Sequence, residues 1–327
     1  SAHQQPDRLG AQCGVLQLSH TQTLAVQHRQ LAAAYREFPE FVRYLESAPA
    51  SRLAGIDCAH GGLFFPACGW LSPPLVCQRL VRCDNIEVVC NSDTETLEWD
   101  GRQWWVSDTR GLRHSAPVVV IATAFEALRF EQTRHLPLRS IRGQVSYLPA
   151  TADSRRLQTV ICAEGYIAPA ANDMHCLGAT FTNRDGDPSL RPADHAANLQ
   201  SLGRAAPALA AGFSNIDINH LAGRTAFRCA TPDYLPVVGP APIHEAFLCD
   251  YAPLRKNARA SIPMAGRYHP GLYLNLGHGS RGLAYTPLCA ELLGAHVEGQ
   301  LLPLPRSLAT VLHPARFIIR DLIRGRQ

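Results

Sequence analysis

A glycine-rich turn near the end of the chain constrains the fold more than any other feature. Gly277, Gly279 and Gly282 satisfy the pattern G-x-G-x-x-G after a strand-like run at 272–276 and before a helical run at 288–297. In this context glycines let backbone N–H groups approach a ligand, and the helix N-terminus favours negative charge. The alternative is a tight connection without a ligand, and we favour the ligand.

The chain after this turn is short. Only residues 283–327 follow, and the proline-rich LLPLP at 301–305 stands where a next strand would be expected. We therefore expect a ligand-binding turn rather than an independent dinucleotide-binding domain. Arg281 at the helix N-terminus is electrostatically unfavourable unless it faces an anionic ligand, the alternative being a solvated surface arginine.

Composition sets the broad class. With 327 residues, 46% of them hydrophobic and 18% charged, the chain is neither disordered nor a small disulfide-framed protein, and two domains are expected. Of the 31 basic residues only Lys256 is a lysine, and the net charge is +4. Because arginine suits planar anion recognition, a phosphate, carboxylate or nucleic-acid partner is plausible.

Several classes of protein are not expected. No run approaches the length of a membrane span, and the N-terminus SAHQQPDRLG lacks an apolar signal region, so we predict a soluble, cytoplasmic protein. The 11 cysteines form no C-x-x-C pair and indicate reduced thiols. The 14 histidines lack metal-ligand spacing, so no metal is predicted.

The element pattern mixes two kinds of structure. Asp100-Gly101 predicts a hairpin, and the apolar run 118–122 predicts a strand covered on both faces. Short strands before and after that run have antiparallel character, so the two domains are expected to interleave. Other expected elements are a strand at 13–18, a helix over 21–46 interrupted by Pro39, a loop at 59–74, and helices at 194–209 and 314–324.

Two long strings carry a resemblance to a known family. GRTAFRCATPDYLPVVGP at 223–240 and the segment 271–303 resemble the D-amino-acid-oxidase-like flavoproteins. GLFFP, EGYIAP and the terminal HPARFIIRDLIRG make the chain more closely similar to the C-terminal FAD-dependent domain of the tRNA 5-methylaminomethyl-2-thiouridine biosynthesis bifunctional proteins. The matches occur in the family's order and span nearly the whole chain.

The resemblance implies an α/β fold with an α+β part. An incomplete FAD-binding Rossmann-like domain, residues 59–137 and 223–327, is expected to interleave with an antiparallel-sheet substrate-binding domain, residues 1–58 and 138–222. Residues 313–327 form a basic C-terminal helix in this scheme. The family's first strand-turn-helix, which cradles the FAD pyrophosphate, and its fused methyltransferase domain are expected to be missing from this chain.

The resemblance also implies a reaction. The expected activity is FAD-dependent oxidative removal of the carboxymethyl group from 5-carboxymethylaminomethyl-(2-thio)uridine at the tRNA wobble position, which leaves 5-aminomethyl-(2-thio)uridine. One alternative is a glycine- or sarcosine-type amine oxidase acting on small molecules. The other is a truncated, cofactor-free chain without activity.

Site residues follow from the same matches. Arg228 and Arg281 are predicted to bind the substrate carboxylate. Tyr166 is a weaker candidate for the substrate pocket, with a core tyrosine as the alternative. Arg142 could equally be a charge that stabilises the fold. The predicted FAD contacts are Ala122, Thr123, Asp233, Pro236, Gly239, Gly277, His278, Gly279, Ser280, Arg281, Gly282 and Leu283.

Two further expectations concern the tRNA and one loop. Arg316, Arg320 and Arg324 recur every four residues and predict a basic stripe for tRNA phosphates, with a solvated helix face as the alternative. Phe64, Phe65 and Trp70 are guessed to stack on unstacked bases. The family's usual Ala-Thr-Gly turn reads Ala-Thr-Ala at 122–124.

Overall fold

The computed structural model describes residues 8–326, which divide into two compact units that alternate along the chain. The first unit extends to Glu87 and includes Arg142–Thr182 and Asp187–Ala226. The second comprises Val88–Ile141, Asn183–Gly186 and the chain from Phe227 onward. Residues 59–87 thus pack with the first unit, whereas the sequence placed them in the FAD-binding domain. The roles of the two units stay predictions, and residues 1–7 and 327, at the ends of the predicted domains, lie outside the described part.

The first unit is built on a large mixed sheet. Its strand order is β14-β10-β13-β12-β11-β2-β4-β3, with β15 also paired to β10. All neighbours along β10–β13–β12–β11 are antiparallel, while β11 and β2 run parallel. The strands are β2 (Val15–Leu18), β3 (Arg43–Leu45), β4 (Gly62–Phe65), β10 (Arg139–Pro149), β11 (Val160–Cys162), β12 (Tyr166–Ile167), β13 (Met174–Gly178), β14 (Thr182–Asn183) and β15 (Gly223–Ala230); β1 (Gly10–Ala11) pairs separately with β5 (Trp70–Leu71).

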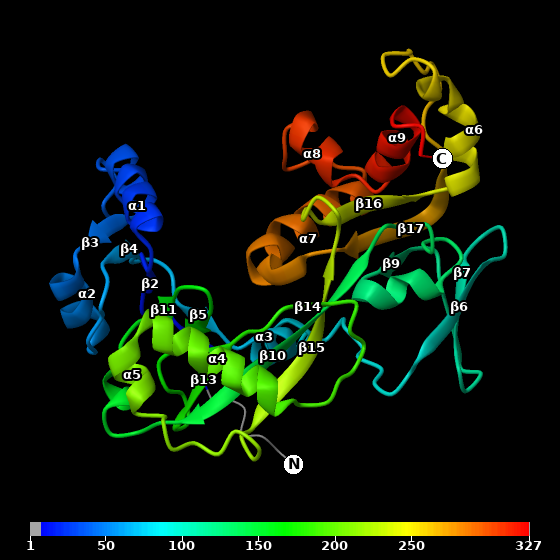
Figure 1. Ribbon diagram of the computed structural model, residues 1–327. Helices are drawn as coiled ribbons and strands as arrows, with labels where there is room; N and C mark the ends of the chain where they lie inside the picture. The colour runs from blue at the N-terminus through cyan, green and yellow to red at the C-terminus, as the bar shows by residue number, and fades with distance from the viewer. Residues whose placement is uncertain (1–7, 327) are drawn as a thin grey trace. The chain divides into compact units, whose positions relative to one another are not determined.

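Helices cover this sheet through apolar contacts. Leu16, Ile161 and Leu177 of the strands pack with Leu202 and Leu209 of α4 and α5 in one buried core. Figure 1 shows α4 and α5 side by side, in green, next to β13. The unit contains α1 (Gln22–Ala34), α2 (Ser47–Ala54), α3 (Pro73–Leu80), α4 (Pro192–Ala205), α5 (Pro207–Ala211) and the short 3-10 turn η2 (Ser154–Arg156).

The second unit contains two three-stranded sheets. One has the order β16-β17-β9, in which β17 is antiparallel to β16 and parallel to β9. The other is the antiparallel meander β6-β7-β8, whose first turn is the predicted hairpin at Asp100-Gly101. The strands are β6 (Thr94–Trp99), β7 (Trp104–Asp108), β8 (Arg113–Ala116), β9 (Val119–Ile121), β16 (Val237–Pro242) and β17 (Tyr268–Leu276).

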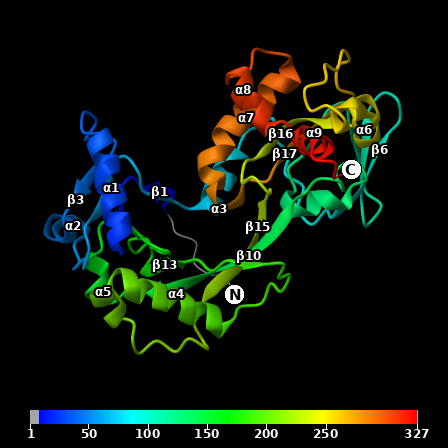
Figure 2. The same cartoon turned by 45° about the horizontal axis from the view of Figure 1, so that its top comes forward.

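The longest helix of the second unit packs on the antiparallel pair of strands β16 and β17. Cys289 and Leu292 of α7 are buried with Val238 of β16, and Figure 2 shows α7 and α8 against β16 and β17. The helical segments are α6 (His244–Asp250), α7 (Gly282–Glu298), α8 (Arg306–Leu312), α9 (Arg316–Ile323) and the 3-10 turns η1 (Ala124–Arg129), η3 (Ala252–Arg255) and η4 (Gly279–Arg281).

Three sequence expectations about elements were wrong in part. The helix expected over 21–46 ends at Ala34, because the chain before Pro39 turns and then enters β3. The expected loop 59–74 contains β4 and β5 and the start of α3. The apolar strand β9 is not buried on both faces, because Val120 is 40% exposed on one face while Ile121 is buried on the other.

Two general features complete the description. Among residues 8–326, every helix is too short or too polar to span a bilayer. The same residues contain no cluster of three His, Cys, Asp or Glu side chains able to bind a metal ion, and all eleven cysteines are free thiols.

Candidate functional site

The predicted strand-turn-helix is present in the second unit. β17 ends at Leu276, the backbone turns through Gly277 (φ +75°) and Gly279 (φ +56°), and α7 begins at Gly282. A Cβ at Gly277 would lie 2.8 Å from the Thr231 methyl carbon, and at Gly279 it would meet nothing closer than Ala230 at 4.0 Å. The first glycine is therefore required by close packing as well as by its φ angle, and the second by its φ angle.

The N-terminus of α7 is electrostatically suited to an anion. No side chain caps this helix, and its first turn carries no acidic residue. Backbone N–H groups at such an end lack intrahelical partners, and the helix dipole favours negative charge there. Arg281 precedes the helix as an exposed side chain whose guanidinium donates to the hydroxyl of Tyr285 at 3.3 Å. Ser280 is exposed and Leu283 is 48% exposed, so both predicted contacts lie at the surface of this unit.

His278 contributes a buried acceptor to the turn. Its Nε2 lies 2.9 Å from the Asn275 amide oxygen and donates to it, while its Nδ1 is buried without a partner among the described residues. Burial lowers the pKa of His278, so the imidazole is neutral at pH 7. A neutral ring with an unmatched acceptor is an ordinary place for a ligand donor.

The end of β15 lies beside the glycine turn. Ala230 forms an antiparallel bridge with His278, and the backbone of Gly277 hydrogen-bonds to the buried thiol of Cys229. Burial raises the pKa of Cys229 to about 11, so this thiol is inert packing. Because strand side chains alternate, the half-buried Arg228 is on the same face of β15 as Ala230, the residue that approaches Gly279.

β9 delivers a second loop to the same sheet edge. β9 runs parallel to β17, with Val119 opposite Leu272 and Ile121 opposite Leu274, so both strands end at one edge. The predicted contacts Ala122 and Thr123 follow at once, and Ala124 adopts φ +52°. Glycine is the residue that ordinarily takes this conformation, so the sequence departure noted at 124 corresponds to local backbone strain.

The turn before β16 is held by a network of side-chain bonds. Thr231 donates to Asp233 (2.9 Å) and to the carbonyl of Leu235 (2.8 Å), and the N–H of Leu235 donates to Asp233 at 3.2 Å. Pro236 then leads into β16, whose Gly239 adopts φ +130°. Asp233 is thus a structural part of the turn.

Arg316 completes that network, which corrects its predicted role. Its guanidinium forms two 3.0 Å bonds to the carboxylate of Asp233 and a 2.8 Å bond to the carbonyl of Leu235. The Arg316 side chain is only 11% exposed. Burial of Asp233 opposes its ionisation, yet Arg316 outweighs this effect, and the pKa of the carboxyl lies below its usual range. Arg316 is therefore committed to the fold and is not presented to a phosphate.

The rest of the expected arginine stripe is uneven. Arg320 is 28% exposed, pairs with Asp321 at 3.3 Å and lies over the ring of Phe317. Arg324 is exposed just beyond the end of α9. The buried face of this helix is made of Phe317, Ile318 and Leu322. The four-residue spacing of the three arginines does fall on a helical segment, but it reflects how this helix is held to the fold as much as it forms a basic surface.

Four residues predicted or guessed in the first unit have mixed environments. Tyr166 on β12 is 38% exposed, with its hydroxyl 3.9 Å from the sulfur of Cys176, so it is not a core tyrosine. Phe64 is buried at 6% exposure, which removes it from the guessed stacking set. Phe65 and Trp70 are half-buried, and Phe65 makes an edge contact with Phe41.

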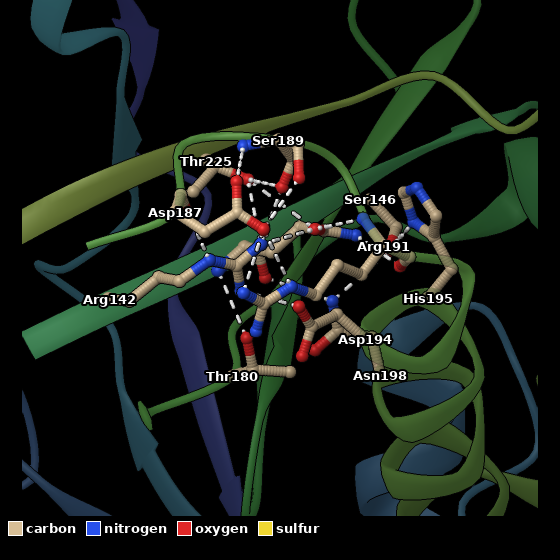
Figure 3. A network of polar contacts seen from close by, with 11 residues as sticks. Arg142, Ser146, Thr180, Asp187, Ser189, Arg191, Asp194, His195, Asn198 and Thr225 are labelled. Atoms are coloured by element: carbon tan, nitrogen blue, oxygen red, sulfur yellow. Dashed lines mark hydrogen bonds and ion pairs between the residues drawn. The ribbon is translucent and has the colours of Figure 1, made fainter. Parts of the chain in front are cut away.

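Arg142 lies at the centre of a buried polar network in the first unit (Figure 3). Its side chain is fully buried and donates to the carbonyls of Asp187 (2.7 Å) and Ser189 (2.6 Å) and to the carboxylate of Asp194 (2.5 Å). The bonds fix the loop before α4 and the start of that helix. Because each of the three guanidinium nitrogens donates to a partner within this network, Arg142 stabilises the fold.

A separate cavity of about 920 Å³ occurs in the first unit. Arg52, Asp57, Asp153 and Arg156 are among its lining residues, and none of the predicted site residues is. Charges of both signs give it no clear ligand preference, and we assign it no role.

The comparison with known proteins decides the family. Residues 1–296 match the model of the FAD dependent oxidoreductase family. The chain belongs to the FAD-dependent oxidoreductases. FAD is therefore its cofactor, and the chain is an enzyme of this class.

The most similar relatives include longer proteins. The chain is 45% identical over 315 residues to the tRNA 5-methylaminomethyl-2-thiouridine biosynthesis bifunctional protein MnmC of Chromobacterium violaceum, covering 95% of this chain and 47% of the relative. It is 44% identical over 317 residues to the protein of the same name from Pseudomonas aeruginosa, covering 96% of the chain and 48% of that relative. The chain thus spans about half the length of the curated relatives it matches.

Solved structures confirm the fold of this FAD-dependent oxidoreductase. Glycine oxidase from Geobacillus kaustophilus superposes with a TM-score of 0.73 at 21% identity, covering 95% of this chain and 76% of that chain. Iminodiacetate oxidase from Chelativorans sp. BNC1 gives a TM-score of 0.67 at 19% identity, with 94% and 76% covered. At such identities the likeness establishes the fold alone.

The glycine turn fits part of a FAD site. The uncapped start of α7, the close backbone approach at Gly277 and Gly279, and the unpartnered Nδ1 of His278 are all suited to a polar, electron-rich ligand. Sequence reasoning found this turn because its signal is local. It missed the strained conformations of Ala124 and Tyr234, for which the sequence carries no signal beyond the departure from glycine at 124.

Proposed function

We propose that this chain oxidises the carboxymethylamino group of a modified uridine at the wobble position of tRNA. The observation that carries the proposal is the place of Arg228, on the strand end that bridges the glycine turn, in a chain 45% identical over nearly its full length to a tRNA-modifying protein. The reaction removes a hydride, that is two electrons and one proton, from the substrate carbon next to the amine nitrogen, and it removes one more proton from that nitrogen, which leaves a C=N bond. Water then hydrolyses the resulting imine to the aminomethyl group and glyoxylate.

The residues of the second unit divide the work of this reaction. Arg228 binds the free carboxylate of the substrate, and a guanidinium does so with two parallel hydrogen bonds that also fix its orientation. The N-terminus of α7 would stabilise the negative charge that a bound flavin acquires when it accepts electrons from the substrate. FAD, when bound, supplies the two-electron oxidant. Arg281, an exposed side chain whose guanidinium donates to the hydroxyl of Tyr285, is the second proposed cation for the substrate carboxylate.

The tRNA contacts are proposed at the C-terminal helix with one correction. Arg324 and the partly exposed Arg320 are retained as phosphate contacts, while Arg316 is withdrawn because it pairs with Asp233. Tyr166 stays a proposed residue of the substrate pocket, since an exposed aromatic ring is suited to that role. We also propose that a methyltransferase part, which the resemblance to the family implies, acts beside this chain in a cytoplasmic setting.

The test is product analysis on tRNA. FAD-supplemented protein is incubated with tRNA that carries 5-carboxymethylaminomethyluridine, and the nucleosides are quantified by mass spectrometry. We expect conversion to 5-aminomethyluridine, and Arg228→Ala lowers kcat/KM by at least about 100-fold while retaining FAD. Arg224→Ala, an exposed arginine on the same strand, is the matched control and retains activity. Turnover of free glycine or sarcosine in preference to tRNA would favour a small-molecule amine oxidase instead.

A further inference from the structure

Tyr234 combines two properties that rarely occur together. It adopts φ +59°, a left-handed conformation, and its side chain is 69% exposed. Asparagine and aspartate tolerate this conformation because short polar side chains can bond locally, whereas a tyrosine gains nothing from it. Because this strained aromatic residue buries little surface, packing does not explain its conformation, and the strain points to a function.

The surrounding turn enforces the conformation. The N–H of Tyr234 donates to the carbonyl of Thr231 at 3.2 Å, and both neighbours of Tyr234 are fixed by side-chain bonds. Arg316 holds the carboxylate of Asp233 on one side and the carbonyl of Leu235 on the other. The backbone of Tyr234 is thus held on both sides, and its ring is attached to a rigid support.

This rigid turn adjoins the candidate site. Thr231, its first residue, contacts the position of Gly277, and Ala230 just before it bridges His278. Arg228 is six residues before Tyr234 on the strand that leads into the turn. The exposed ring of Tyr234 therefore belongs to the turn that directly follows Arg228, the proposed binder of the substrate carboxylate, and Ala230, which bridges the glycine turn.

We propose that Tyr234 is a specificity residue that stacks on the uracil ring of the nucleotide to be oxidised. The inference rests on the proposed function and deepens it. Every base has a π-face on which an aromatic side chain stacks, and a pre-positioned ring loses little freedom on binding. An oxidase of free glycine has no base to bind and no need for such a ring. The modified uridine and free glycine both carry a carboxylate, so the ring of Tyr234 explains how the enzyme would distinguish the nucleotide from the amino acid.

The test uses variants that separate stacking from backbone strain. Tyr234→Gly removes the ring and suits φ +59°, so the fold is retained, while Tyr234→Phe keeps the stacking face. With FAD-loaded protein, we expect Tyr234→Gly to raise KM for the modified tRNA by about 5- to 100-fold, with kcat changed less than about threefold. Tyr234→Phe restores the wild-type value. An anticodon stem-loop RNA, measured by fluorescence anisotropy without turnover, should lose affinity for Tyr234→Gly by a similar factor.

The control and the contrary outcomes are distinct. Phe38→Ala removes another exposed aromatic ring, 55% exposed in the first unit, and should leave the stem-loop affinity unchanged. Equal losses for Phe38→Ala and Tyr234→Gly, wild-type RNA affinity in Tyr234→Gly, or a loss of FAD in place of RNA affinity would each overturn the assignment. If wild-type protein binds RNA but oxidises no tRNA, the proposed function fails, and the binding measurement still decides the role of Tyr234.

Discussion

Two neighbouring turns of the second unit are built in opposite ways. The turn 277–282 follows β17 and relies on glycines, which adopt left-handed angles without strain. The turn 231–235 precedes β16 and contains a strained Tyr234, held by the ion pair between Asp233 and Arg316. The two turns touch, since Thr231 packs against Gly277. The turn 277–282 depends on the backbone freedom of its own glycines. The turn 231–235 depends on contacts from Arg316 of α9, which is far away in the sequence but adjacent in space.

The first prediction breaks the glycine turn. Gly277→Val adds a Cβ 2.8 Å from Thr231 at φ +75°, and we expect a loss of about 4 kcal/mol in the free energy of unfolding, with loss of FAD binding. Gly279→Ala is the matched variant, because its Cβ meets nothing nearer than 4.0 Å and only the φ of +56° is unfavourable. It should cost about 1–2 kcal/mol. Urea unfolding followed by circular dichroism measures both, and equal losses would contradict the packing argument.

The second prediction breaks the clamped turn. Arg316→Met leaves the Asp233 carboxylate and the Leu235 carbonyl without their partner, and we expect a loss of about 2–3 kcal/mol. Arg324→Met, at an exposed position of the same helical segment, should change stability by less than about 0.5 kcal/mol. It should weaken tRNA binding at low salt instead. Stability losses of the same size in both variants would return Arg316 to the surface stripe.

The contrast between the two turns also separates the features that the sequence predicted from those that it did not. The glycine turn, the hairpin at Asp100-Gly101 and the end of β17 at Leu276 were predictable, because each signal lies within a few residues, whereas β17 begins at Tyr268, four residues before the predicted start. The bond between Arg316 and Asp233 joins residues 83 positions apart, so no local pattern shows it. The strand β9 was expected to be buried on both faces, but an apolar run does not show whether other elements cover both faces of its strand, and Val120 is 40% exposed.

The third prediction uses pH to test the segment before α9, which contains His313 and leads into Arg316. Burial, together with His296 and Arg316, lowers the pKa of His313 from 6.5 to about 4. The unfolded chain therefore binds a proton at a higher pH than the folded chain does. The contribution of His313 to the free energy of unfolding is full above about pH 6.5. It falls, by on the order of 2–3 kcal/mol, as the pH decreases to about 4.

His313→Phe should flatten this part of the stability profile, measured by urea unfolding at a series of pH values. His220→Phe changes a histidine that is 87% exposed and should leave the profile as it is. A wild-type slope in His313→Phe would show that other groups cause the acid sensitivity.

The smallest expected effect concerns the third loop at the same sheet edge. Ala124 adopts φ +52°, a conformation that glycine takes without strain, so Ala124→Gly should stabilise the protein by about 0.5–1 kcal/mol. The rise in thermal midpoint, read by calorimetry, checks this prediction. A destabilised Ala124→Gly variant would mean that this side chain makes a contribution larger than the strain.

The most direct test of the whole account is an anaerobic titration of the FAD-loaded protein with tRNA. Bleaching of the flavin absorbance at about 450 nm reports electrons passing from substrate to cofactor. The account predicts bleaching by tRNA that carries 5-carboxymethylaminomethyluridine, none by tRNA that carries the aminomethyl product, and none with either tRNA in Arg228→Ala. A fully loaded wild-type flavin that stays oxidised with the carboxymethylaminomethyl tRNA would contradict it.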